Sequence, residues 1–203
     1  MNIALQRLSE VDAYLLFSQI IIPRPIAWVL TDNGAEQAAE RWNLAPFSYF
    51  NSITSDPPMV MFSIGDGMAG KIKDTHRNLK KNPECVINLA CVEQATDIQN
   101  SSEDLPAGQS EAKKFNIALT NWDWPIPRVT AAPISMGCIA RQFTRVGNTE
   151  QIVVFAEITR LWVHEDVGAF DARGQLLIDV KEFNPLARVG KGAYARLSEV
   201  FRV

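Results

Sequence analysis

The stretch NLAPFSYFNSITSDPPMVMFSIGDGMAG, Asn43 to Gly70, predicts two β-strands separated by a break at Pro57-Pro58. Aromatic and β-branched residues favour strands, and paired prolines favour a turn. Several side chains are nevertheless small or polar where a packed strand would carry bulk, at Ala45, Pro46, Ser48, Asn51, Ser52, Ser55 and Ser63. The stretch therefore belongs either to a loosely packed sheet or to a sheet that leaves room for a flat ligand.

The composition predicts one large domain over residues 1–203. Hydrophobic residues make up 47% of the chain, which is enough for a substantial core. The formal net charge is -3, and acids and bases are interleaved along the sequence. Such a pattern lacks the basic footprint of proteins that bind nucleic acid or anionic membranes. We therefore expect small molecules or proteins as partners, and neither nucleic acid nor membrane.

The cysteines and the N-terminal segment predict a cytoplasmic protein. Cys85, Cys91 and Cys138 are odd in number and never form C-x-x-C, which argues against a disulfide framework and a structural zinc site. Acidic residues precede the first apolar stretch, and no small-residue cleavage site follows it. The apolar run Tyr14 to Ile22 is too short to span a membrane.

Strands dominate the predicted order of elements, and helices are few. Helical spacing fits Glu10–Ile20, and a short helix is expected over Thr75–Lys81. A polar helix is also expected over Ser110–Leu119, followed by an irregular surface segment, NWDWPIPRVTAAP. Strands are expected at Ile26–Thr31, Leu44–Ile53, Pro58–Ile64, Cys85–Cys91 and in three runs after Ile134. Several are apolar on both faces, as expected when one face lines a closed barrel and the other meets a helix or a second subunit.

The segment Gly65 to Gly70 matches the dinucleotide-binding pattern G-x-G-x-x-G, and Glu93 stands about where a ribose-binding acid would be. A doubly wound sheet needs helices between parallel strands, whereas this chain predicts successive strands joined by turns. Three residues, Lys71 to Lys73, also separate the last glycine from a helix cap at Asp74 or Thr75. A plain glycine-rich loop is favoured, with a dinucleotide fold as the alternative.

The adjoining segment KIKDTHRN predicts an anion site. A helix that begins at Asp74-Thr75 would place unpaired N–H groups beside Lys71, Lys73 and Arg77. A terminal phosphate would fit there. The alternative is a capped surface helix with solvated lysines.

Hydrolytic and metal chemistry find little support in the sequence. The segment Gly108 to Ala112 lacks the final glycine of the G-x-S-x-G nucleophile motif. His76 and His164 have no neighbours at metal-ligand spacing. We therefore predict no metal site.

Successive blocks of the chain resemble the flavin reductase-like, FMN-binding split-barrel family, which includes flavoredoxins. In order, these blocks are AYLLFSQIIIPRPIAWVLT, NLAPFSYFNSITSDPP, FSIG followed by KDTHRN, CVINLA, P-x-G-x-S-E and PLARVGKGAYARLSEVF. They cover nearly the whole chain. The resemblance implies a mainly β fold, an FMN-binding split β-barrel with a few peripheral helices, and a homodimer with the cofactor near the interface.

The resemblance also implies the residues that hold FMN. The segment Asn43 to Ser52 would lie along the isoalloxazine ring, and the matching basic, small and polar positions are Arg24, Ala45, Pro46, Ser48, Asn51 and Ser63. The K-D-T-x-x-N pattern that holds the phosphate is matched by Lys73, Thr75 and Asn78. No catalytic side chain is expected, because the flavin itself carries the redox chemistry.

Three departures from the family pattern concern the approach to the flavin and a later strand. They are the AEQAAER insert, Gly137 in place of a frequent acid, and Lys191, which interrupts R-x-G-G near Arg188. The roles of the insert and of Arg188, Lys191 and Tyr194 are not assigned by the pattern. The implied function is an oxidoreductase of the NAD(P)H-dependent flavin reductase type. The alternative is a non-enzymatic electron carrier that a partner protein reduces.

Overall fold

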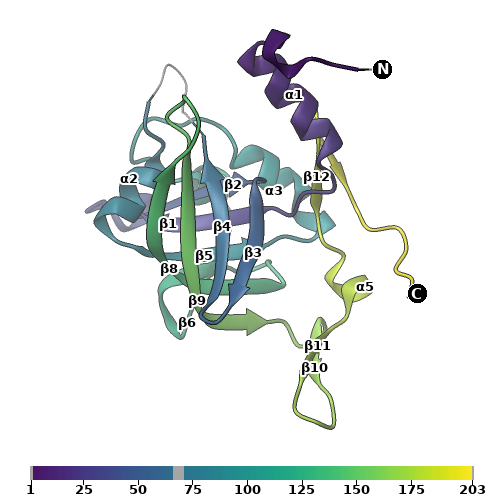
Figure 1. The fold of residues 1–203 in the computed structure, drawn as a ribbon. Coiled ribbons are helices and arrows are strands. Elements are labelled where there is room, and N and C mark those ends of the chain that lie inside the picture. The colour runs from purple at the N-terminus through teal and green to yellow at the C-terminus, as the bar shows by residue number, and fades with distance from the viewer. Residues whose placement is uncertain (1, 66–70, 203) are drawn as a thin grey trace.

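The computed structural model describes residues 2–65 and 71–202, and its largest element is a curled antiparallel sheet (Figure 1). The strand order is β2-β1-β5-β8-β9-β4-β3, and β2 contacts β4 where the sheet would close. The strands are β1 (Ala27–Asp32), β2 (Trp42–Phe47), β3 (Phe50–Ser55), β4 (Pro58–Ile64), β5 (Glu84–Leu89), β8 (Ile134–Arg145) and β9 (Ile152–Val163). This arrangement is the expected split barrel, and its antiparallel pairing departs from a doubly wound dinucleotide fold. The Gly65–Gly70 motif lies outside the described residues from Asp66 onward.

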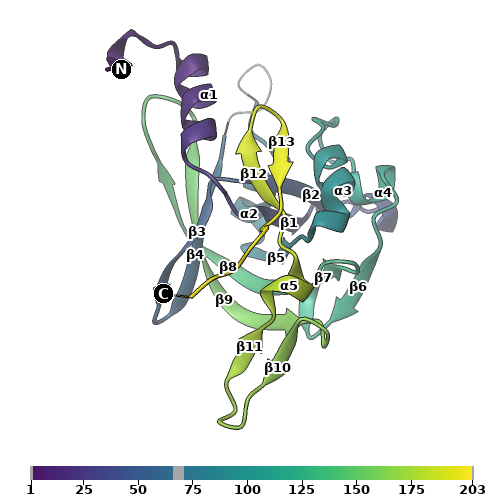
Figure 2. The same cartoon turned by 90° about the vertical axis from the view of Figure 1, so that its right-hand side faces the viewer.

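Short helices and hairpins surround the barrel, as Figures 1 and 2 show. The helices are α1 (Glu10–Ile20), α2 (Asp74–Lys81), α3 (Ala95–Asn100), α4 (Glu111–Lys114) and α5 (Val180–Phe183), with 3-10 turns at Leu5–Arg7, Ala38–Glu40 and Val92–Gln94. The hairpins are β6 (Leu119–Trp122) with β7 (Trp124–Val129), β10 (Gly168–Phe170) with β11 (Leu176–Ile178), and β12 (Ala187–Gly190) with β13 (Ala193–Ala195). The helix expected at Glu10–Ile20 is confirmed, and the second begins one residue earlier than expected.

At β1 the main sheet buries both of its faces. On β1, Ala27 and Val29 join the cluster inside the barrel, whereas Trp28 and Leu30 join a second cluster outside it. The outer cluster is completed by α3, α4 and the β6–β7 hairpin, through residues that include Ile98, Ala112, Ile126 and Val129. The alternation explains why successive residues of this strand are all apolar.

Three expected elements differ in detail. The strand expected at Leu44–Ile53 is two strands, β2 and β3, because the chain bends at Ser48-Tyr49. The helix expected at Ser110–Leu119 ends at Lys114. The expectation of an irregular surface segment at NWDWPIPRVTAAP was wrong, since it forms the β6–β7 hairpin. There the prolines stand on β7, which pairs only with β6, so the missing N–H groups are tolerated.

A glycine on β8 allows this hairpin to pack closely. A Cβ atom at Gly137 would lie 2.8 Å from Cδ2 of Trp124 and 3.1 Å from Cβ of Arg160. The Trp124 ring therefore occupies the space that a side chain at position 137 would need. This contact gives a structural reason for Gly137 at a position where the family often has an acid.

Helix α1 stands apart from the barrel in both views (Figures 1 and 2). Ser18 is its only buried residue, and none of its residues belongs to the two apolar clusters. Its C-terminal end is held by Arg24, whose Nη1 donates to the carbonyl oxygens of Ser18 and Ile21. A cation at this end also complements the helix dipole. Gly190, with φ +88°, brings β12 so close to Ser18 that a Cβ atom would lie 2.6 Å from its carbonyl oxygen.

We predict that Gly137→Ala lowers the free energy of unfolding by about 1–3 kcal/mol, because the added methyl group overpacks the contact with Trp124. Urea unfolding of the parent and the variant measures this difference. Gly65→Ala is the matched control, since no atom of residues 2–65 and 71–202 lies within 4 Å of a Cβ atom at Gly65. Equal stability of the Gly137→Ala variant and the parent would contradict the proposed packing role.

Candidate functional site

A cavity with a volume of about 730 Å³ lies between β2, the start of α2 and the loop after α3. This volume is in the range of pockets that hold small molecules and cofactors. Its lining comprises residues 43, 45–47, 71–75, 77, 101–107 and 111. Four of the nine sequence-predicted site residues are among them, namely Ala45, Pro46, Lys73 and Thr75.

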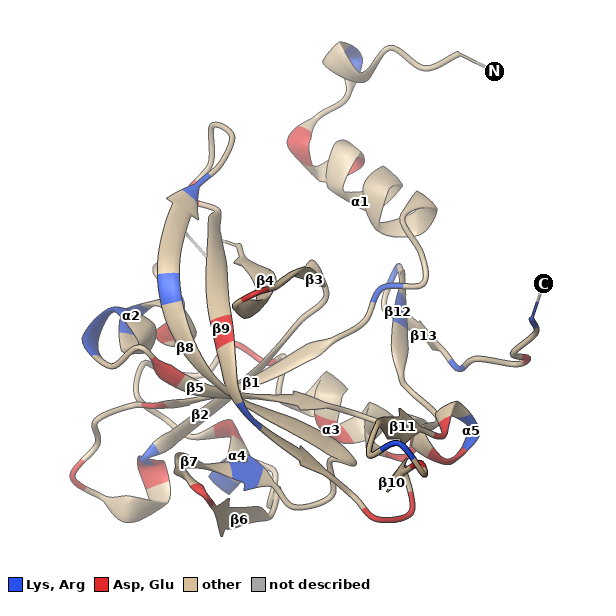
Figure 3. Ribbon diagram, turned by 60° about the horizontal axis from the view of Figure 1, so that its bottom comes forward, with Lys and Arg blue, Asp and Glu red and all other residues tan. Residues whose placement is uncertain are grey.

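The start of α2 supplies the basic side of this cavity. Lys71, Lys73 and Arg77 line it, and Figure 3 shows that the ribbon of α2 is rich in basic residues. Lys73 is the N-cap residue, and its side chain accepts no hydrogen bond from the first turn. The helix therefore does not have the side-chain cap expected at Asp74 or Thr75. Uncapped N–H groups beside lysines are suited to binding an anion.

Two contacts connect the start of α2 to the loop that forms the opposite wall. Lys73 Nζ lies 3.5 Å from Asp104 Oδ1. Asp74 accepts a 2.7 Å hydrogen bond from the backbone N–H of Gly108 and also pairs with Arg77 at 2.8 Å. The Lys73–Asp104 pair is partly exposed, so it contributes little to stability. Lys73 can therefore exchange this partner for an anionic ligand at small cost.

A buried polar network positions α2 against β1 and β2. The Asn43 side-chain amide donates to Thr75 Oγ1 at 2.9 Å, and the Asn78 amide donates to Thr31 Oγ1 at 3.1 Å and to Asn33 Oδ1 at 2.9 Å. Thr75 accepts from Asn43, so its own hydroxyl hydrogen can point to a ligand in the cavity. Asn78 does not line the cavity, because its amide nitrogen is directed to β1. Its role as a phosphate ligand stays a prediction.

The cavity wall at the end of α3 is held in place by a residue of the outer apolar cluster. The indole N–H of Trp28, on β1, donates a 2.9 Å hydrogen bond to Oγ of Ser101. Ser101 stands at the end of α3 and lines the cavity. This hydrogen bond therefore connects the outer apolar cluster, which contains Trp28, to the cavity wall, which contains Ser101.

Arg24 and Ser48 form a separate cluster at the bend between β2 and β3. Arg24 is 5% exposed, and its guanidinium donates to the end of α1. Its Nε lies 3.4 Å from Oγ of Ser48, and Cζ lies 5.9 Å from the ring centroid of Tyr49. Neither Arg24 nor Ser48 lines the cavity. Their contacts with a cofactor stay predictions.

Asn51 and Ser63 also lie outside the cavity lining. Asn51 is exposed on β3, which is an edge strand of the sheet, and its Oδ1 accepts from the N–H of Ser52. Ser63, on β4, accepts a 2.6 Å hydrogen bond from the side-chain amide of Gln151. The structure thus brings four predicted residues together at the cavity and distributes the other five around it.

Glu111 is the cavity residue that the sequence did not reveal as functional. It is 7% exposed, and its Oε2 accepts a 2.9 Å hydrogen bond from the backbone N–H of Leu44 on β2. Burial raises the pKa of the Glu111 carboxyl to about 7, although the Leu44 N–H opposes this effect. The sequence signal was weak, because an acid that follows an N-cap serine is usually exposed in the first helical turn.

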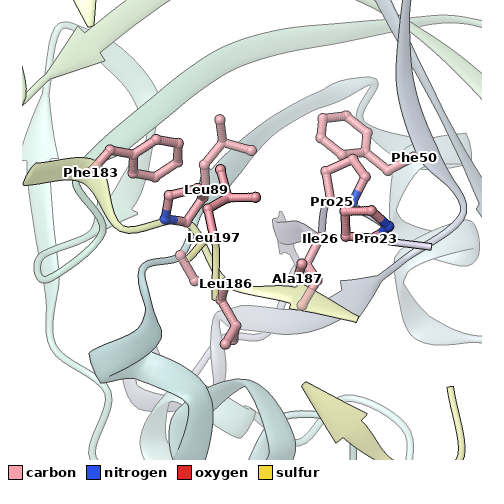
Figure 4. Close-up of a pocket in the computed structure, with 11 residues that line it drawn as sticks. Pro23, Pro25, Ile26, Phe50, Leu89, Phe183, Leu186, Ala187 and Leu197 are labelled. Atoms are coloured by element: carbon pink, nitrogen blue, oxygen red, sulfur yellow. The ribbon is translucent and has the colours of Figure 1, made fainter. Parts of the chain in front are cut away.

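A smaller cavity of about 230 Å³ has a different character (Figure 4). All of its lining residues are apolar, and they come from the entry to β1, the start of β3, the end of β5 and the C-terminal segment. Pro23, Phe50, Leu89 and Leu186 are among them. A cavity lined by apolar side chains offers a phosphate no charged or hydrogen-bonding side chain, so it does not suit the anionic part of a nucleotide.

The other segments with unassigned roles line neither cavity. The AEQAAER insert, residues 35–41, is connected to α4, because Glu40 accepts from the N–H of Ser110 and pairs with Lys113. Arg188 and Tyr194 share an acceptor, Oε1 of Gln99, at 3.5 and 3.1 Å. Lys191 stands at the turn of the β12–β13 hairpin with φ +47°.

Metal and membrane features can be assessed only over residues 2–65 and 71–202. In those ranges no group of three or more His, Cys, Asp or Glu side chains is placed to hold a metal ion. Nor is any helix there long and apolar enough to cross a membrane.

Comparison with known proteins gives matches over the whole length of the chain. A family described as "Flavin reductase like domain" matches residues 18–184. A protein of Deinococcus radiodurans is 31% identical over 201 residues, which are 98% of this chain and 87% of that protein.

Two solved structures align with the entire chain. Nitrilotriacetate monooxygenase component B from Bacillus cereus has a TM-score of 0.87 at 28% identity, over 98% of its own chain. The 2-nitrobenzoate 2-nitroreductase NbaA from Pseudomonas fluorescens has a TM-score of 0.85 at 27% identity, over 95% of its own chain.

Proposed function

Since this chain belongs to the flavin reductase-like family, we propose that it binds FMN and acts as an NAD(P)H-dependent oxidoreductase. The observation that carries the proposal is the 730 Å³ cavity, in which the uncapped start of α2 and two lysines face the small residues of β2. The similarity to a nitroreductase and to a component of a monooxygenase supports a redox role. We place the protein in the cytoplasm, where Cys85, Cys91 and Cys138 would remain thiols.

The residues of the cavity fit the chemistry of FMN. Lys71 and Lys73, the first N–H groups of α2 and the Thr75 hydroxyl would hold the phosphate. Ala45 and Pro46 carry little bulk and have no charge, so an aromatic ring can approach the β2 backbone closely. When bound, the flavin supplies the hydride or electron chemistry. The protein then contributes binding, orientation and local charge.

The reductase proposal predicts that NADH or NADPH bleaches the FMN absorbance of the loaded protein rapidly under anaerobic conditions. Stopped-flow absorbance measures the rate with each nucleotide separately. If the flavin stays oxidised with both nucleotides and is reduced only after a partner reductase is added, the protein is an electron carrier and not a reductase. A protein that takes up no flavin would contradict both.

The phosphate site predicts that Lys73→Ala weakens FMN binding by about tenfold to a hundredfold, because a charged hydrogen bond worth about 1.5–3 kcal/mol is lost. Quenching of flavin fluorescence gives the dissociation constant. Riboflavin, which lacks the phosphate, should bind more weakly than FMN and be insensitive to the substitution.

Lys80→Ala is the matched control for the phosphate site. Lys80 is on the same helix but lies 4.1 Å from the ring centroid of Phe143 and does not line the cavity. Its removal should leave both dissociation constants unchanged. If Lys73→Ala binds FMN as the parent does, the start of α2 is not the phosphate site.

We further propose that two copies of this chain form a homodimer through α1. An isolated helix of 11 residues is only marginally stable in water, and α1 buries one residue against its own chain. Large apolar side chains are exposed on it, with Val11 at 66%, Tyr14 at 59% and Ile20 at 59%. A second copy is the occupant that would cover these side chains symmetrically, in keeping with the homodimers that the family resemblance implies.

The dimer proposal predicts a mass in solution of about twice 22.6 kDa by light scattering. The double substitution Val11→Lys with Ile20→Lys should halve this mass, because it places two desolvated charges in the interface. Val146→Lys, at an exposed apolar residue in the turn after β8, is the control and should leave the dimer intact. A parent protein that is monomeric and still binds FMN would overturn the dimer alone.

A further inference from the structure

Glu111 is a buried acid in the wall of a cavity whose opposite wall is basic. One carboxyl oxygen, Oε2, accepts from the N–H of Leu44, and the backbone N–H of Glu111 itself also favours the ionised form. No hydrogen bond joins Oε1 to another of the described residues. A buried carboxylate is costly when its charge has lost water without gaining a full set of partners, and burial outweighs the two backbone hydrogen bonds here. The same group in its acid form carries its proton on the free oxygen and becomes a hydrogen-bond donor.

The surroundings of Glu111 combine charges of both signs. The start of α2 presents Lys73 and Asp74 to it, and these act in opposite directions on its ionisation. The remaining charged groups around the cavity and α4 are Lys71 and Arg77, Glu103 and Asp104 of the loop, and the Glu40–Lys113 pair beside Ser110. The described lining contains no histidine and no cysteine, which are the side chains whose ordinary pKa values lie closest to neutrality.

We propose that Glu111 binds FMN in its neutral form, with the acid proton on Oε1 donated to a phosphate oxygen of the ligand. This inference rests on the proposed function and assigns to Glu111 a binding role in the same cavity. A phosphate dianion repels a carboxylate within one cavity but accepts a strong hydrogen bond from an acid. Binding of the dianion therefore requires that the ionised form of Glu111 takes up a proton.

The sign of the pH dependence follows from this requirement. The pKa of Glu111 is about 7 in the free protein, and a bound dianion raises it further. FMN affinity is then full below that pKa and falls as the pH rises above it, by at most about tenfold for each pH unit. The second ionisation of a phosphate ester, near pH 6, is nearly complete above pH 7 and does not add to this change.

The test measures dissociation constants of FMN and riboflavin by fluorescence quenching between pH 7.0 and 8.5. For the parent protein the FMN constant should rise by about five- to fifteenfold over this range, whereas the riboflavin constant should change much less. Glu111→Gln retains an acceptor for the Leu44 N–H. The dissociation constant of this variant for FMN should not change with pH over this range. Glu157→Gln is the control, because Glu157, on β9, is paired with Arg141 at 2.7 Å and does not line the cavity; it should keep the dependence of the parent.

A second measurement needs no variant. Calorimetric titration of FMN into the parent protein at pH 7.5, in two buffers with different ionisation enthalpies, should show net uptake of up to one proton. Three results would overturn the role of Glu111 and leave the flavin function intact: pH-independent FMN binding, an equal pH dependence for riboflavin, or no proton uptake. Absence of flavin binding at every pH would instead remove the proposed function, and this inference with it.

Discussion

The hydrogen bond from the Asn43 amide to the Thr75 hydroxyl is the contact on which the candidate site depends. It joins β2, which lines the cavity, to the first turn of α2, and both side chains are buried. Breaking such a bond leaves a buried polar group without a partner, which costs more than the bond itself contributes. The distance between the small residues of β2 and the basic residues of α2 is therefore fixed before any ligand arrives.

Much of the fold was predictable because its pattern is local. The apolar residues on both faces of β1 indicated a strand between two clusters, and the spacing of Glu10–Ile20 and Thr75–Lys81 indicated helices. The β6–β7 hairpin was not predictable in the same way. Its two prolines, Pro125 and Pro127, indicated an irregular segment. Its strands are stabilised by distant residues, since Gly137 accommodates Trp124 and Asn88 accepts from the N–H of Val129.

The candidate site was predicted in part for the same reason. Lys73 and Thr75 stand in one short segment, and a helix start beside lysines carries its own chemical meaning. The pKa of Glu111 is raised only because β2 and the loop after α3 shield its carboxyl from water. A local sequence pattern does not indicate this burial. Arg24 shows the reverse case. Its basic character was evident, but its hydrogen bonds to the end of α1 arise from a chain reversal that the sequence does not display.

The contact between Gly190 and Ser18 joins two segments that lie far apart in the sequence and are therefore made at different times. During synthesis on the ribosome, residues 10–20 emerge well before the strand on which α1 rests, residues 187–190. Arg24 is paired with Arg188 through backbone hydrogen bonds, so the entry to β1 has to wait as well. The barrel strands between them can pair as they emerge, whereas α1 has no β12 to pack against until residues 187–190 have been made.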